Sequence, residues 1–273
     1  MQELHIGEND AGQRFDKYLK KLLAEAPGSF VYKMLRKKNI TLNGKKADGT
    51  EKLSCGDEVK LFLSDETYEK FRAKSKTVMP EAFSGSEKTL RQLKVLYEDA
   101  DILIINKPSG MLSQKARPED VSANEYILSY LLREGALTEE EMRTFRPSVC
   151  NRLDRNTSGI LIAGKTLKGL QEMSKALKER TIQKYYRCVV KGEVLREDYL
   201  KGWLVKDERE NKVTVSTVKP KSADAAPIET AYRPIWTGGG YTGLEVHLIT
   251  GRSHQIRAHL ASIGHPIIGD VKY

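Results

Sequence analysis

From residue 93 onward, short apolar runs of strand length follow one another, with few helical stretches between them. Turn-forming residues bound most of these runs, as in strands that are joined by hairpins. A parallel sheet would need a helix after almost every strand, and the sequence shows no such regular alternation. The region is therefore predicted to be α+β with a mainly antiparallel sheet. The predicted strands are residues 95–97, 102–105, 160–163, 185–190, 213–218, 229–236 and 244–249.

Three helices are predicted among these strands. The first opens at Ser122, whose spacing to Glu125 matches a capping box, and the second covers residues 167–177. Thr138 and Glu141 match a second capping box. The third is predicted to start at Ser253 and to end before Gly264, a typical C-cap residue. Its expected buried side consists of Ile256, Leu260 and Ile263.

Residues 12–63 have the pattern of a small separate domain. Apolar residues recur with helical spacing from Phe15 to Leu23, and a second short helix is predicted after Gly28. A strand over residues 40–42 runs into Asn43 and Gly44, a strong signal for a tight turn, and a strand over 59–63 closes the domain.

Residues 64–92 mix charges of both signs with Ser, Gly and Pro and show no clear period, which indicates a linker. The predicted organisation is a first domain over residues 1–63, a linker over 64–92 and a second domain over 93–273.

The charge of the chain favours a polyanionic partner. Lysine and arginine number 46 against 37 acidic residues, which gives a formal net charge of +9. Six basic residues and no acidic one lie between residues 31 and 46, on the second predicted helix and the turn beside it. This pattern suits phosphate binding, although a solvated helix face explains it about equally well. The six are Lys33, Arg36, Lys37, Lys38, Lys45 and Lys46.

Several classes of protein are disfavoured. The N-terminus has neither the basic nor the apolar part of a secretory signal, and no apolar run approaches the ~20 residues of a membrane span. We therefore expect a cytoplasmic protein with no membrane partner. Three widely separated cysteines exclude a disulfide framework, and His254 and His259 lie about 140° apart on a helix, so no metal site is expected.

Residues 159–166 (GILIAGKT) match the pattern of a phosphate-binding loop, but we reject this interpretation. Such a loop must follow a buried strand and curl so that its N–H groups converge on the phosphates. Here the four residues between the two glycines are themselves the predicted strand. An NTPase is therefore not expected.

Two polar segments indicate chemistry more strongly. Residues 151–159 (NRLDRNTSG) hold Asp154 between two arginines, and residues 250–257 (TGRSHQIR) place Arg252 where a strand changes into a helix. An aspartate in such a loop is more often a turn or cap residue. By themselves these residues indicate an RNA-binding enzyme and no more.

With these segments the chain resembles an RluA-type pseudouridine synthase over nearly its whole length. The family's catalytic R-L-D-x-x-T-S-G segment is similar to residues 152–159, its lysine-x-tyrosine strand to Lys184–Tyr186, and its T-G-R-[ST]-H-Q-I-R segment to residues 250–257. Residues 106–110 (NKPSG) resemble the family's strand-ending K-P-x-G. Residues 12–63 resemble the S-four-like RNA-binding domain that often precedes these synthases.

The resemblance implies the role of each site residue. Asp154 would act as nucleophile or base, Arg252 as the cation that keeps this carboxylate ionised, and Tyr186 as the ring that stacks on uracil. Arg152 would fill the place of the flipped nucleotide, and Arg155 would contact RNA. The reaction needs no cofactor or metal, and we expect a monomer. Two departures from the family are that Asn151 replaces a common histidine and that the chain stops at Tyr273, where the family usually continues; we interpret this end as a truncation.

The resemblance favours large-subunit ribosomal RNA as the substrate. A transfer-RNA substrate is the nearest alternative. A non-catalytic RNA-binding factor for ribosome assembly is a third hypothesis, against which the intact Asp154, Tyr186 and Arg252 argue.

Overall fold

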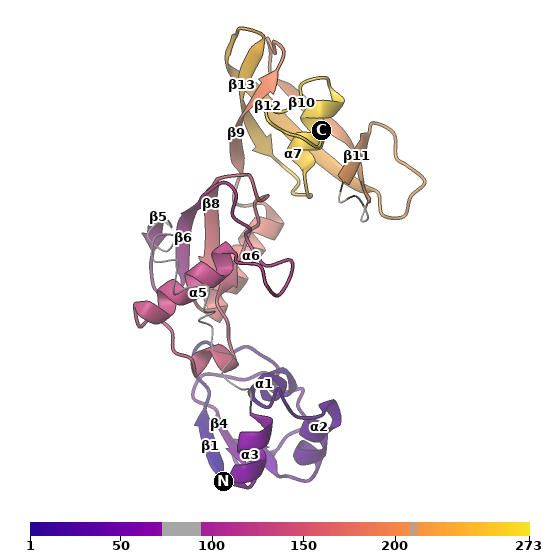
Figure 1. Ribbon diagram of the computed structural model, residues 1–273. Helices are drawn as coiled ribbons and strands as arrows, with labels where there is room; N and C mark the ends of the chain where they lie inside the picture. Colours follow the sequence, from indigo (N-terminus) through magenta and orange to yellow (C-terminus); the bar gives the residue numbers. More distant parts are fainter. Residues whose placement is uncertain (73–93, 208–209, 211) are drawn as a thin grey trace. The chain divides into compact units, whose positions relative to one another are not determined.

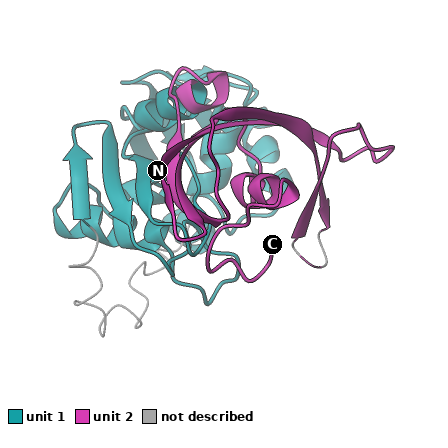
Figure 2. Ribbon diagram, turned by 90° about the horizontal axis from the view of Figure 1, so that it is seen from above, with its two compact units in different colours: residues 1–175 teal, residues 176–273 magenta. Residues whose placement is uncertain are grey.

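The computed structural model describes residues 1–72, 94–207, 210 and 212–273, so most of the predicted linker lies outside the described residues. The chain forms two compact units, residues 1–175 and residues 176–273 (Figures 1 and 2). Each unit is described by itself below.

The N-terminal part of the first unit packs helices on a small antiparallel sheet. The helices α1 (Phe15–Leu22) and α2 (Gly28–Arg36) confirm the predictions from apolar spacing. The sheet has the order β1-β4-β2-β3, and Asn43 and Gly44, both with positive φ, form the predicted tight turn. Its strands are β1 (Gln2–His5), β2 (Ile40–Leu42), β3 (Lys45–Lys46) and β4 (Glu58–Leu61).

The beginning of the predicted linker is folded. Ser64 caps a helix, α3 (Asp65–Phe71), by accepting a hydrogen bond from the N–H of Thr67 at 3.2 Å. Tyr68 and Phe71 pack against the N-terminal core, and the ring of Phe71 lies 4.7 Å from that of Phe30. Residues 64–71 therefore belong with the first domain. A short polar helix with only two partly buried aromatic residues gives little periodicity for a sequence to reveal.

The rest of the first unit contains a second antiparallel sheet, of order β5-β6-β8-β7. The hairpin of β5 (Lys94–Glu98) and β6 (Ile102–Lys107) confirms the prediction, and β8 (Gly159–Gly164) lies between β6 and β7 (Ser148–Val149). Helix α5 (Ala123–Arg133) opens with the predicted capping box. The second such box, at Thr138 and Glu141, opens only a 3-10 turn, Glu141–Arg143.

The segment that imitates a phosphate-binding loop has a structural function instead. Residues 159–164 form strand β8, as the rejection of that interpretation required. A Cβ on Gly164 would lie 2.4 Å from the backbone of Leu170, so the glycine permits helix α6 (Leu167–Glu179) to pack closely. Lys165 donates to Glu98 at 2.7 Å, and Thr166 donates to Asp101 at 2.6 Å. These residues tie α6 to the β5–β6 hairpin.

The second unit is a five-stranded antiparallel sheet of order β11-β10-β12-β13-β9, with α7 (Gln255–Ser262) packed on one face. The strands predicted for this region are confirmed, although β11 ends at Ser216 and not at residue 218. Strand β10 was not predicted, because Gly202 and several charged residues interrupt its apolar alternation. The other strands are β9 (Tyr185–Lys191), β10 (Asp198–Asp207), β11 (Lys212–Ser216), β12 (Ala226–Gly238) and β13 (Tyr241–Leu248).

Two details of the last predicted helix are wrong. It begins at Gln255 and not at Ser253, because His254 has the left-handed conformation, with φ of 53°, that a helix cannot continue through. Ile263 is 36% exposed and follows the last helical residue, so it does not belong to the buried side. Gly264, with φ of 85°, occupies the expected position after the helix.

Candidate active site

Asp154 lies in the loop that connects β7 to β8. Leu153 before it is buried, Asp154 is half-buried, and the flanking Arg152 and Arg155 are exposed. The N–H of Thr157 donates to the carbonyl of Asp154 at 3.1 Å and closes a turn. The loop thus buries an apolar side chain on one side and exposes two arginine side chains to solvent, and Arg155 also donates from Nε to the carbonyl of Gly110 at 3.3 Å.

Ser113 fixes the loop immediately before Asp154. Its hydroxyl accepts a hydrogen bond from the N–H of Leu153 and donates one to the carbonyl of the same residue, both at 2.9 Å. A hydroxyl can do both because it has a donor and two acceptor positions. Ser113 is buried, and sequence analysis did not identify it because it lies 40 residues from Leu153.

Lys107, at the end of β6, lies fully buried beneath the same loop. Its ammonium group donates to the carbonyls of Met111 at 2.7 Å, Pro108 at 3.0 Å and Arg155 at 3.1 Å. Burial lowers the pKa of Lys107, and the negative charge of Asp154 opposes this shift. From the family resemblance, the K-P-x-G motif was predicted only to end a strand, and Lys107 was given no role in the site. A sequence signal was present nonetheless, since Lys107 follows Leu103 and Ile105 on the buried face of β6.

Tyr186 lies on β9 in the second unit. It is half-buried and packs against the core that β9, β13 and α7 share. Successive side chains of a strand point to opposite faces, so the neighbouring Tyr185 points away from that core. Tyr185 instead stacks on His247, with ring centroids 4.7 Å apart. Of the two adjacent tyrosines, Tyr186 is therefore the one on the α7 side of the sheet.

Arg252 is exposed, and its backbone is rigidly held at the start of α7. The buried side chain of Gln255 accepts hydrogen bonds from the N–H of Arg252 at 3.1 Å and the hydroxyl of Thr250 at 2.8 Å. The same carboxamide donates to the Glu229 carbonyl at 3.0 Å and the Thr230 hydroxyl at 2.9 Å. The guanidinium group of Arg252 therefore extends from a backbone that is fixed in place. Sequence analysis included Gln255 in the motif but gave it no role.

The predicted catalytic residues belong to different units. Asp154 lies within residues 1–175, whereas Tyr186 and Arg252 lie within residues 176–273. The structure brings Lys107, Ser113 and the Asp154 loop together, and separately it holds Arg252 on Gln255. The pairing of Arg252 with Asp154 stays a prediction.

The basic cluster of the N-terminal domain is solvent-exposed. All six of its side chains are exposed, on the last turns of α2, just after that helix and on β3. Cations at the end of a helix are favoured by the helix dipole. The cluster stays a prediction as an RNA contact.

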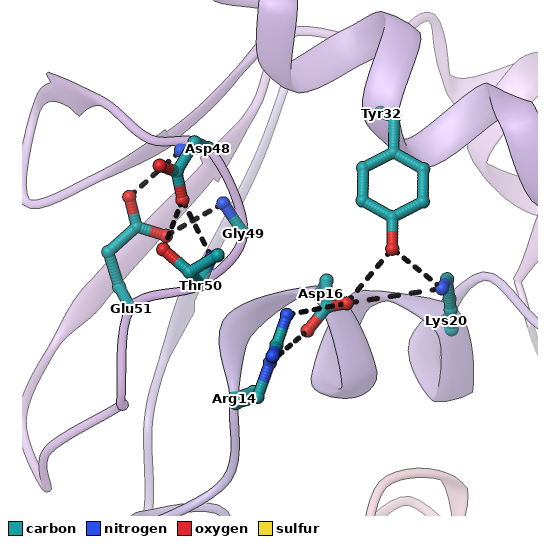
Figure 3. Close-up of polar contacts among 8 residues, drawn as sticks. All are labelled: Arg14, Asp16, Lys20, Tyr32, Asp48, Gly49, Thr50 and Glu51. Atoms are coloured by element: carbon teal, nitrogen blue, oxygen red, sulfur yellow. Dashed lines mark hydrogen bonds and ion pairs between the residues drawn. The ribbon is translucent and has the colours of Figure 1, made fainter.

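A polar network holds α2 against α1 next to this cluster (Figure 3). Buried Asp16 accepts hydrogen bonds from Arg14 at 3.1 Å and from the hydroxyl of Tyr32 on α2 at 3.0 Å. Lys20 donates to the same hydroxyl at 2.9 Å. Burial acts to raise the pKa of Asp16, but the hydrogen bonds from Arg14 and Tyr32 outweigh it, so the pKa is lowered. A Cβ on Gly49 would lie 3.0 Å from that of Asp16, so the neighbouring turn requires glycine.

The histidines of the second unit have protein partners. His259 is buried, and a ring nitrogen lies 3.0 Å from the Thr230 hydroxyl, while a ring nitrogen of His254 lies 2.8 Å from the Tyr273 hydroxyl. Within the described ranges, no three His, Cys, Asp or Glu side chains are grouped as a metal site would require. No helix in the described part of the chain is both long and apolar enough to cross a membrane.

Comparison with known proteins identifies the class. Residues 101–262 match the RNA pseudouridylate synthase family, and the chain belongs to this family. It is a pseudouridine synthase, an isomerase.

Individual relatives match over almost the whole chain. The chain is 32% identical to "Ribosomal large subunit pseudouridine synthase C" of Vibrio vulnificus, over 100% of this chain and 80% of that protein. It is 31% identical to the Escherichia coli K12 protein of the same name, over 98% of this chain and 78% of that one. Among solved structures, human RNA pseudouridylate synthase domain containing 4 has a TM-score of 0.58 at 21% identity, covering 70% of this chain and 73% of that one. This last similarity concerns the fold alone.

Proposed function

We propose that the chain converts specific uridines of large-subunit ribosomal RNA to pseudouridine, with Asp154 as the residue that carries the reaction. The observation that supports this substrate most strongly is that relatives named for the large ribosomal subunit match the chain nearly end to end. The net charge of +9 and the exposed arginines beside Asp154 suit an RNA substrate.

The reaction breaks the bond from the ribose to N1 of uracil, turns the base, and forms a new bond from the ribose to C5, which then loses its proton. Asp154 acts either as a nucleophile toward the sugar or as the base that removes a ribose proton. Tyr186 stacks on the detached uracil and Arg252 keeps Asp154 ionised. Arg152 fills the gap left in the RNA stack, and Arg155 contacts the RNA backbone. Neither a cofactor nor a metal takes part, and the chain acts as a monomer.

A tritium-release assay tests the substrate. Large-subunit ribosomal RNA and bulk transfer RNA, each labelled with tritium at C5 of uridine, are incubated separately with the chain. Release from ribosomal RNA alone is expected. Release from transfer RNA alone would favour the nearest alternative substrate, and release from neither would favour a non-catalytic RNA-binding role.

Arg252→Lys is expected to lower kcat for tritium release by about 100-fold, with little change in RNA affinity. Lysine keeps the charge but not the planar fork of donors that a guanidinium group offers to a carboxylate. The exposed Arg196→Lys, on the same unit, is the matched control. A kcat within twofold of the unchanged chain would remove Arg252 from the proposed mechanism.

Lys33→Gln/Lys37→Gln is expected to weaken RNA binding and to flatten its salt dependence. Each lost phosphate contact should reduce the slope of log affinity against log salt by about 0.7 to 0.9. Lys175→Gln/Lys178→Gln, on exposed positions of α6, removes the same charge and should leave the slope nearly unchanged. Equal slopes for the two variants would mean that the cluster is only a solvated helix face.

A further inference from the structure

Asn151, three residues before Asp154, makes an unusual contact with strand β8. Its side-chain Oδ1 accepts a hydrogen bond from the N–H of Ile162 at 2.8 Å, and its Nδ2 donates to the carbonyl of Ile160 at 3.1 Å. The side chain thus binds two backbone groups on one edge of the strand.

Asn151 contacts β8 at the position where the pairing between β7 and β8 ends. Strand β7 pairs with β8 through Ser148 and Val149, and the N–H of Cys150 adds one more bond, to the carbonyl of Ile162 at 2.7 Å. Beyond Cys150 the chain no longer pairs with β8 and instead forms the Asp154 loop. The carboxamide of Asn151 then takes the place of the next peptide group, since both offer one donor and one acceptor in a plane.

We propose that Asn151 is a positioning residue, whose carboxamide fixes the point at which the catalytic loop departs from β8 and thereby sets the position of Asp154. This inference rests on the proposed role of Asp154. Ser113 holds Leu153 and Lys107 holds Arg155, so Asn151 supplies the tie on the remaining, N-terminal side of the loop. Asp154 is consequently held from before and after, as a group that must meet a reacting atom requires.

The chemistry of the site explains why asparagine suits it. An aspartate would place a second acceptor against the carbonyl of Ile160, and alanine would leave both strand groups without this partner. A neutral histidine has one donor and one acceptor on separate sides of its ring, so it can satisfy one of the two groups. The expected order of kcat is therefore Asn151, then Asn151→His, then Asn151→Ala, with Asn151→Asp lowest.

The experiment measures kcat and KM by tritium release for these three variants in the full chain. We expect kcat to fall about 10- to 100-fold in Asn151→Asp while KM stays within twofold, because displacement of a reacting group affects the chemical step. Gln171→Glu makes the same change from amide to carboxylate at an exposed position of α6 and should retain full activity. In parallel, amide hydrogen exchange at Ile162 should be faster in Asn151→Asp and unchanged in Gln171→Glu.

The possible outcomes separate this inference from the proposed function. Release from no RNA by the unchanged chain would contradict the proposed function, and the exchange rate of Ile162 would still report whether Asn151 holds β8. A folded Asn151→Asp with kcat within twofold of the unchanged chain overturns the inference. If the Ala and Asp variants do not fold, Asn151→His decides: full kcat in that variant, or a rise in KM in place of a fall in kcat, also overturns it.

Discussion

Asp154→Asn is expected to lower tritium release to less than about one ten-thousandth of its rate, while the affinity for RNA changes little. The amide has the volume of the carboxylate, but it can neither attack the sugar nor accept its proton. The substitution should therefore lower turnover by orders of magnitude, while binding of the same RNA, measured by filter retention, stays nearly unchanged.

The matched control for this prediction is Asp224→Asn, which changes an exposed carboxylate in the second unit in the same way. It should keep full turnover. If Asp154→Asn retained more than a trace of activity, the catalytic role would belong to another residue.

Lys107→Met should have the largest effect on stability, lowering the free energy of unfolding by about 3 kcal/mol. Methionine fills a similar volume but cannot donate to the carbonyls of Pro108 and Met111, which are bound by the lysine ammonium. The carbonyl of Arg155 still accepts a hydrogen bond from the N–H of Gly110 at 2.9 Å. Losing the lysine therefore costs less free energy at this carbonyl than at the other two. Removal of a buried charge offsets part of the total cost. Denaturant unfolding followed by circular dichroism measures the change.

Turnover of the folded Lys107→Met protein should also fall, by at least about tenfold, because the loop that carries Asp154 loses one of its ties. Lys175→Met, at an exposed position of α6, controls for the general effect of removing a lysine and should change neither quantity. Unchanged stability in Lys107→Met would show that the three hydrogen bonds contribute nothing net.

The sequence predicted most of the secondary structure because the relevant signals are local. Apolar spacing in α1 and α2, the Asn43-Gly44 turn, and the capping box at Ser122 each depend on residues within a few positions of one another. The same reasoning correctly rejected the apparent phosphate-binding loop at residues 159–166, since its central residues form a strand. It failed for α3 and β10, whose periodicity is weak and whose formation depends on what they pack or pair with.

By itself, the sequence determined the antiparallel α+β class, the basic N-terminal domain and the candidate residues Asp154, Tyr186 and Arg252. Only the tertiary structure decided what holds Asp154 and Arg252. Lys107 reaches the loop across 48 residues, Ser113 across 40, and Gln255 reaches Glu229 across 26. These are hydrogen bonds between residues far apart in the chain, and no repeat or spacing in the sequence reveals which partner each residue will find. They exist because buried polar groups must find partners wherever folding brings one within reach.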